Sequence, residues 1–147
     1  MVSAKNIDCV RLLAAQGGDL HFISNTGEHL LSNAVARNDV SFVKELLELG
    51  INPDLNSACE TALHTAISSD YFAAAKLLLE AGANPNQQDV DGWSTLHQCN
   101  SRKAIDFMLK HGADPSLGDC MGSTAEETFE RMGRPDLASH LRGKTSV

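Results

Sequence analysis

Cys59-Glu60-Thr61-Ala62-Leu63-His64-Thr65-Ala66 is the stretch that decides the fold, because it returns in altered form along the chain. The further copies are Gly27-Glu28-His29-Leu30-Leu31-Ser32-Asn33-Ala34, Gly92-Trp93-Ser94-Thr95-Leu96-His97-Gln98-Cys99 and Gly122-Ser123-Thr124-Ala125-Glu126-Glu127-Thr128-Phe129. A second series that begins with glycine keeps the same register: Gly17-Gly18-Asp19, Gly50-Ile51-Asn52-Pro53, Gly82-Ala83-Asn84-Pro85 and Gly112-Ala113-Asp114-Pro115. In both series successive copies lie 30 to 33 residues apart. A period of this size predicts a repeat architecture, in which each unit packs against its neighbours.

The chain resembles the ankyrin-repeat family, which is marked by a period of about 33 residues and a T-P-L-H-x-A start to the first helix of each repeat. Thr61-Ala62-Leu63-His64-Thr65-Ala66 differs from this motif at Ala62, where the family has proline. The resemblance extends from about Asn6 to Leu141. It implies an all-α solenoid of stacked helix-turn-helix repeats with β-hairpin-like fingers, and a role in binding proteins.

The register of the copies predicts a single ankyrin-repeat domain over residues 1–147. Residues 1–18 align with the second helix of a repeat, so we expect an N-terminal half-repeat there. Four repeats are expected at about 19–51, 52–83, 84–113 and 114–143, and the tail 144–147 is expected to fray.

Apolar residues at matching positions predict the core face of the second helices. They form two series, spaced three residues apart: Val10, Val43, Ala75, Ile105 and Ala138, and Leu13, Leu46, Leu78, Met108 and Leu141. Gly50 and Gly82 follow two of these helices, as expected of a residue that adopts positive φ at a helix end. Pro85 disfavours helical backbone in the residue before it and so marks the start of a connecting finger.

Two copies depart from the pattern. The third lacks about three residues between Cys99 and Ala104, so its first helix is expected to be short and to end near Asn100-Ser101. We therefore predict a notch in the first-helix face, with Trp93 on its finger side. In the second copy Cys59 takes the place of glycine. Because a non-glycine residue is disfavoured at positive φ, a different turn is expected there.

The composition excludes several classes of function. A net charge of −7 argues against a nucleic-acid partner and against anionic membranes, since phosphate groups attract basic surfaces. No apolar run approaches the ~20 residues that span a bilayer, and the N-terminus lacks the long apolar core of a secretory signal. The cysteines are far apart and form no C-x-x-C pair, which predicts reduced thiols and a cytoplasmic location. They are Cys9, Cys59, Cys99 and Cys120.

The sequence contains no pattern of catalytic residues and no cofactor motif. His64 and His97 occupy equivalent positions in adjacent layers, but helix layers lie roughly 10 Å apart. That is too far for two metal–nitrogen bonds of ~2 Å to one ion, so we expect no metal. The resemblance implies instead that this histidine bonds the backbone and the motif threonine, and Thr61 and Ser94 preserve that partner. Glu126-Glu127 is expected to form a solvated C-terminal cap.

The resemblance implies a binding surface made of the finger tips and the exposed side of the first helices. Carried over by position, it comprises Glu28, Ser57, Ala58, Glu60, Val90, Asp91, Trp93, Cys120 and Met121 at the tips, and Arg37, Ser68 and Ser69 on the helices. Trp93 is the only tryptophan and stands at a variable tip position. It is either a binding anchor, as aromatic residues often are at interfaces, or it packs against the neighbouring finger.

Two functions fit this surface. The first is an adaptor or scaffold that docks one protein. The second is an inhibitor of an enzyme, such as a kinase inhibitor or a bacterial immunity protein, and it differs in covering the partner's active site. An enzyme with an unrecognised site is a third class, which a cluster of titratable groups in a deep pocket would favour. The acidic residues Glu28, Glu60 and Asp91 favour a partner with a basic patch, and we expect a monomer.

Overall fold

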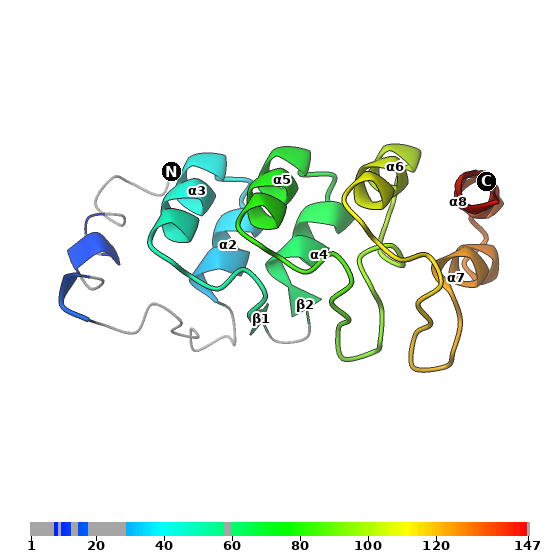
Figure 1. The fold of residues 1–147 in the computed structure, drawn as a ribbon, viewed down its shortest axis with the longest axis horizontal. Helices are drawn as coiled ribbons and strands as arrows, with labels where there is room; N and C mark the ends of the chain where they lie inside the picture. Colours follow the sequence, from blue (N-terminus) through cyan, green and yellow to red (C-terminus); the bar gives the residue numbers. More distant parts are fainter. Residues whose placement is uncertain (1–7, 9, 13–14, 18–28, 58–59, 147) are drawn as a thin grey trace.

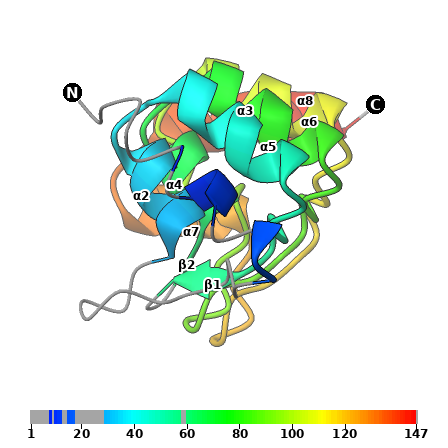
Figure 2. The ribbon, with the colours of Figure 1, turned by 90° about the vertical axis from the view of Figure 1, so that its left-hand side faces the viewer.

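The computed structural model describes residues 8, 10–12, 15–17, 29–57 and 60–146 of the chain. Its elements are α2 (Leu30–Ala36), α3 (Val40–Glu48), β1 (Asn56–Ser57), β2 (Glu60–Thr61), α4 (Ala62–Ser68), α5 (Phe72–Glu80), α6 (Arg102–Lys110), α7 (Ala125–Arg131) and α8 (Pro135–Thr145). They form an elongated stack (Figure 1). Figure 2 looks along this stack and shows one layer with α2, α4 and α7 and another with α3, α5, α6 and α8. The described residues thus form the all-α solenoid expected from the sequence.

Short polar side chains set where the helices begin. The Thr61 hydroxyl accepts a hydrogen bond from the backbone N–H of His64 at the start of α4. Thr124 does the same for Glu127 at the start of α7, and the Glu127 carboxylate accepts the Thr124 N–H in return. Such caps satisfy backbone donors that have no partner inside the helix and contribute about 1 kcal/mol each. The motif threonine therefore fixes where α4 and α7 start, whereas α2 begins after His29 without a side-chain cap.

The three fingers within the described residues lie on the same side of the stack (Figure 1). Strands β1 and β2 pair antiparallel, with Asn56 opposite Thr61. The next two fingers are closed by single bridges, Gln88 to Ser94 and Gly118 to Thr124. These short pairings close each of the three fingers at its base.

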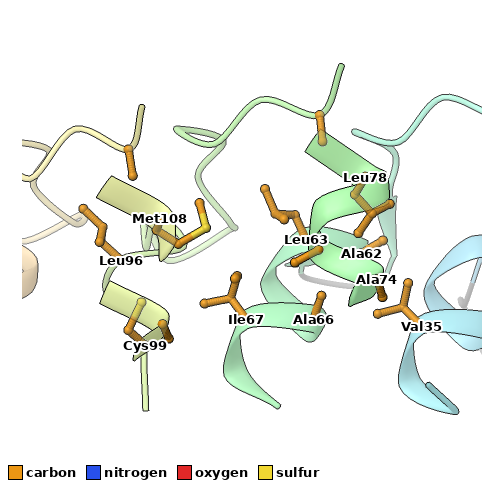
Figure 3. Packing of buried hydrophobic residues seen from close by; sticks show 14 of the residues in the cluster. Val35, Ala62, Leu63, Ala66, Ile67, Ala74, Leu78, Leu96, Cys99 and Met108 are labelled. Atoms are coloured by element: carbon orange, nitrogen blue, oxygen red, sulfur yellow. The ribbon is translucent and has the colours of Figure 1, made fainter. Parts of the chain in front are cut away.

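The core lies between the two helix layers. The described members of the two predicted apolar series are all buried: Val10, Val43, Ala75, Ile105, Ala138, Leu46, Leu78, Met108 and Leu141. Leu13 lies outside the described residues. Figure 3 shows Leu63 and Ile67 of α4 pointing along the stack toward Leu96 and Cys99 of the following unit. Full burial of a Leu or Ile side chain contributes about 1.5–3 kcal/mol, so these contacts between units hold the solenoid together.

The predicted helix ends are confirmed at Gly50 and Gly82, whose φ angles are +84° and +96°. At the second site the N–H of Gly82 donates to the carbonyl of Leu79, and the N–H of Ala83 donates to that of Leu78. This pair of bonds satisfies the last carbonyls of α5 and requires positive φ at Gly82.

The third unit corrects one expectation, because it has no first helix at all. The N–H groups of His97, Gln98 and Cys99 each donate to the carbonyl three residues earlier, and the segment ends there as a succession of turns. Ser101 then caps α6 by accepting the N–H of Ala104. Because residues are missing after Cys99, the chain before α6 is too short to form the successive hydrogen bonds between residues four apart that make an α-helix.

The end of the chain also differs from expectation. Helix α8 continues to Thr145, where fraying was expected from residue 144. Lys144 lies 3.3 Å from the Asp106 carboxylate of α6, and this ion pair fastens the last turn to the neighbouring unit. The turn predicted at Cys59 lies outside the described residues. Among the helices of the described segments, none has the length and apolar character required to cross a bilayer.

Candidate protein-binding surface

Each motif histidine joins its own helix start to the next finger. His64 is buried, and its Nδ1 lies 2.8 Å from the Thr61 hydroxyl. Its Nε2 lies 3.0 Å from the carbonyl oxygen of Trp93 in the following unit. A neutral imidazole carries one donor and one acceptor, so Nε2–H donates to this carbonyl and Nδ1 accepts the hydroxyl. Burial lowers the pKa of His64 below its ordinary value and keeps the ring neutral.

His97 repeats this arrangement one unit further along. Its Nδ1 lies 3.0 Å from the Ser94 hydroxyl, and its Nε2 lies 3.0 Å from the carbonyl oxygen of Ser123. The bracing role that the resemblance implied for both histidines is confirmed. Within the described part of the chain, no three His, Cys, Asp or Glu side chains gather closely enough to hold a metal ion.

The third and fourth fingers are fastened side by side. The Gln88 amide donates to the carbonyl of Gly92 in its own finger and, at 2.8 Å, to the carbonyl of Gly118 in the next. The backbone N–H of Cys120 donates to the carbonyl of Asp91 at 3.0 Å. The two tips therefore present one continuous surface.

Apolar side chains are exposed at these two tips. Val90 is 66% exposed and Met121 is 78% exposed. Asp91 and Cys120 are exposed between them, and the Cys120 thiol is free. Four of the five predicted tip residues of the third and fourth fingers are thus exposed, and Trp93 is the fifth.

The predicted tip residues of the first and second fingers are less exposed or lie outside the described residues. Glu60 is half-buried, and its carboxylate accepts a hydrogen bond from the Thr65 hydroxyl at 3.2 Å. Glu28 and Ala58 lie outside the described residues, and of Ser57 only the backbone is described, as part of β1.

The predicted helix positions lie at the ends of two first helices. Arg37 is exposed and caps the C-terminus of α2. Ser69 is exposed at the end of α4, where the half-buried Ser68 donates its hydroxyl to the carbonyl of Thr65. Arg37 also lines a pocket of about 330 Å³ between α2, α3 and Val10.

Trp93 combines features of the two roles considered for it, a binding anchor and a packing residue. The side chain is half-buried, and its ring stacks on that of His97 with centroids 6.3 Å apart and an interplanar angle of 20°. It also lines an open recess of about 440 Å³ in the first-helix layer. The predicted notch in this layer is present, with Trp93 at its edge.

The recess contains residues that sequence reasoning missed. It is lined by Ser68, Trp93, His97, Gln98, Cys99, Asn100, Phe129, Met132 and Arg134. The Asn100 side-chain amide donates to the carbonyl of Ser68 at 2.8 Å, and the Arg134 guanidinium donates to the carbonyl of Asn100 at 2.9 Å. The missing residues after Cys99 could locate the recess, but no signal linked it to Arg134, which lies 34 residues beyond Asn100.

The charges near the fourth finger are largely paired. Asp119 accepts the N–H groups of Met121 and Ser123, and its carboxylate lies 3.4 Å from Arg131. The Ser123 N–H contributes most to holding the pKa of Asp119 below its ordinary value. Further along, Arg142 pairs with both Glu126 and Glu130, so the expected acidic cap is neutralised in part by α8.

Comparison with known proteins establishes the family. A family model of ankyrin repeats, in three copies, matches residues 1–89 and 31–119. This chain therefore belongs to the ankyrin-repeat family, whose repeats are generally protein–protein interaction modules.

Three relatives show the range of this similarity. An ankyrin repeat-containing protein of Treponema pallidum is 30% identical over 139 residues, which are 91% of this chain and 47% of that protein. SH3 and multiple ankyrin repeat domains protein 2 of Homo sapiens is 32% identical over 126 residues, 82% of this chain and 7% of that protein. RelA-associated inhibitor of Mus musculus is 32% identical over 121 residues, 76% of this chain and 14% of that protein. The chain spans less than half the length of each of these relatives.

Proposed function

We propose that the chain is a non-enzymatic adaptor or scaffold, which docks one protein on its finger tips and first-helix layer. The observation that carries this proposal is the exposed apolar surface on two linked fingers. Val90 and Met121 are 66% and 78% exposed, and the bond from the Cys120 N–H to the Asp91 carbonyl holds their tips together. Exposed apolar surface gathered in one place is the usual mark of a protein-interaction site.

The chemistry around this surface suits a partner with a basic patch. Asp91 is exposed beside Val90, and the whole chain carries a net charge of −7. Opposite charges across an interface guide the two proteins together. We further propose that the chain acts in the cytoplasm, since the described cysteines Cys99 and Cys120 are free thiols.

Inhibition of an enzyme is a second candidate function, and one comparison favours it. RelA-associated inhibitor, to which the chain is 32% identical, is named as an inhibitor. The two functions use the same surface and differ in what it covers. Loss of the partner's catalytic activity in the complex, restored by substitutions at the finger tips, would distinguish inhibition from docking.

The proposal is tested by affinity capture from the protein's own host cells, with bound proteins identified by mass spectrometry. A double variant, Val90→Asp with Met121→Asp, places charge on the apolar tips. The matched control is Leu12→Asp, which changes an exposed leucine outside this surface (64% exposed). We expect proteins that the wild type and the control retain to be lost from the double variant. Retention by all three would contradict the proposed surface.

A further inference from the structure

The recess in the first-helix layer exists because one helix is missing from it. On either side, α4 and α7 each contribute 7 helical residues to this layer. Between them the third unit supplies only the turns that end at Cys99. The space left over measures about 440 Å³ and opens to the surface beside Trp93. This volume lies within the ~300–1,000 Å³ typical of ligand pockets.

The floor of the recess is apolar. Cys99 and Phe129 line it and are only 1% and 2% exposed, so they belong to the core directly beneath it. Trp93 closes the finger side, and Met132, which is 57% exposed, stands at the end of α7. A bulky apolar side chain inserted here would be removed from water on several sides. Such burial is favourable by about 1.5–3 kcal/mol for one Leu, Met or Phe.

Arg134 places a positive charge at the end of the recess farther from the fingers, and a hydrogen bond holds it there. Arg134 donates one N–H to the Asn100 carbonyl at 2.9 Å, and Asn100 is itself held by its bond to Ser68. The Arg134 side chain is 39% exposed, and the nearest carboxylate, that of Asp136, lies 4.0 Å away. A guanidinium has five N–H donors in a planar fork that matches a carboxylate. Arg134 therefore keeps donors for a carboxylate brought in from outside.

The surrounding charges favour an acid at this end. Arg102 and Lys103 are the first residues of α6, two and three positions after the recess residue Asn100, and both are exposed. Asp70 accepts the Ser101 hydroxyl at 2.8 Å and does not line the recess. On the finger side, the Asp89 carboxylate accepts a hydrogen bond from the side-chain amide of the recess residue Gln98 at 3.1 Å. Of the residues that line the recess, Arg134 is the one Lys, Arg, Asp or Glu, so a carboxylate is attracted to its end.

We propose that the recess receives a bulky apolar side chain of a partner protein, placed next to an aspartate or glutamate whose carboxylate pairs with Arg134. The inference rests on the proposed function and names the chemistry of the segment that the partner inserts. It adds an acidic anchor to a partner whose basic patch faces the finger tips.

A displayed library of random peptides tests the inference without a known partner. The library is selected on the wild-type protein, and peptides also retained by Ser68→Tyr, which fills the recess, are discarded. Thermal unfolding checks that this variant folds. The surviving peptides are expected to combine Leu, Met or Phe with Asp or Glu within two positions. Because Trp93 is the only tryptophan, its emission reports on occupation of the recess directly and should shift to shorter wavelength on binding.

Paired substitutions then test the Arg134 contact. Arg134→Gln should weaken a selected peptide about tenfold or more, as loss of a charge-assisted bond does. Replacing the peptide's acid by its amide should cost a similar factor, after which Arg134→Gln should have little further effect. The controls Lys110→Gln and Ala81→Tyr change exposed residues of the other helix layer and should leave the affinity unchanged.

Three results would overturn the inference: no recess-dependent peptides, such peptides without an acidic residue, or an affinity indifferent to Arg134→Gln. The proposed function fails independently of these results. A captured partner that is lost from the Val90→Asp, Met121→Asp variant but retained by Ser68→Tyr would overturn the recess proposal alone. A partner that is indifferent to the finger-tip variant would overturn the proposed function instead.

Discussion

At the scale of single residues, His64 links stability to pH. Burial lowers its pKa below the ordinary 6.5 in the folded state, so between that lowered value and about 6.5 the unfolded chain binds more protons. The contribution of His64 to stability is therefore complete above about 6.5 and is lost as pH falls through this window. His64→Ala should reduce stability by about 1–3 kcal/mol at neutral pH, and should also make the acid decline shallower.

Urea unfolding of wild type and His64→Ala across this pH range measures both effects. A decline equally steep in the two proteins would contradict the assignment of a buried, neutral ring to His64.

The two roles considered for Trp93 predict different effects of its substitution. Replacing a packing residue would lower stability, whereas replacing a binding anchor would lower affinity for the partner. The ring stacks on His97 but is only half-buried, and the bond from His64 goes to its backbone carbonyl, which a substitution leaves in place. Trp93→Ala should therefore cost much less stability than the ~3–5 kcal/mol expected for Phe129→Ala in the core. Its effect on partner binding should be about 2 kcal/mol or more, as at hot spots. Calorimetric unfolding and titration of a captured partner separate the two; a large loss of stability with unchanged affinity would make Trp93 purely structural.

At the scale of elements, the contact between the third and fourth fingers depends on Gly92. Its φ is +77°, and a Cβ there would lie 2.6 Å from the backbone nitrogen of Cys120. Gly122 has a similar φ of +80° but open space around it. Both Ala substitutions cost roughly 1–2 kcal/mol for the left-handed backbone, and Gly92→Ala must in addition push the two fingers apart.

We expect Gly92→Ala to lower the melting temperature more than Gly122→Ala and to weaken partner binding as well. Equal melting temperatures for the two variants would show that the fingers are not in firm contact.

The elements also show how far the sequence could predict this structure. The core series, such as Val43 and Ala75, could be predicted because the repeat places one apolar residue at the same helical position in each unit. The notch after Cys99 could be predicted from the residues missing there. We expected a short first helix in the third unit, but none forms, because a helix needs several successive backbone hydrogen bonds before it becomes stable. The contacts of Arg134 and Glu60 depend on side chains meeting across units and within a turn, which periodicity does not encode.

At the scale of the whole molecule, charge should govern how fast a partner arrives. The net charge of −7 and the exposed Asp91 attract a basic patch over distances that salt shortens, since exposed charges are screened beyond ~8–10 Å at physiological ionic strength. Raising the salt concentration should slow association more than it speeds dissociation. Asp91→Lys should slow association further and preserve the fold, because Asp91 bonds its neighbours through its backbone.

Stopped-flow or surface-based kinetics of a captured partner measure these rates. An association rate indifferent to salt and to Asp91→Lys would mean that the interface is chiefly apolar, around Val90 and Met121.

If a protein partner docks on the finger tips, site-specific photocrosslinking in host cells should capture it there. A benzoylphenylalanine replaces Met121 in one variant and Leu12 in another, both exposed positions (78% and 64%). We expect a discrete crosslinked partner from position 121 and none from position 12. Crosslinking of the same partner from position 12, with none from position 121, would contradict it.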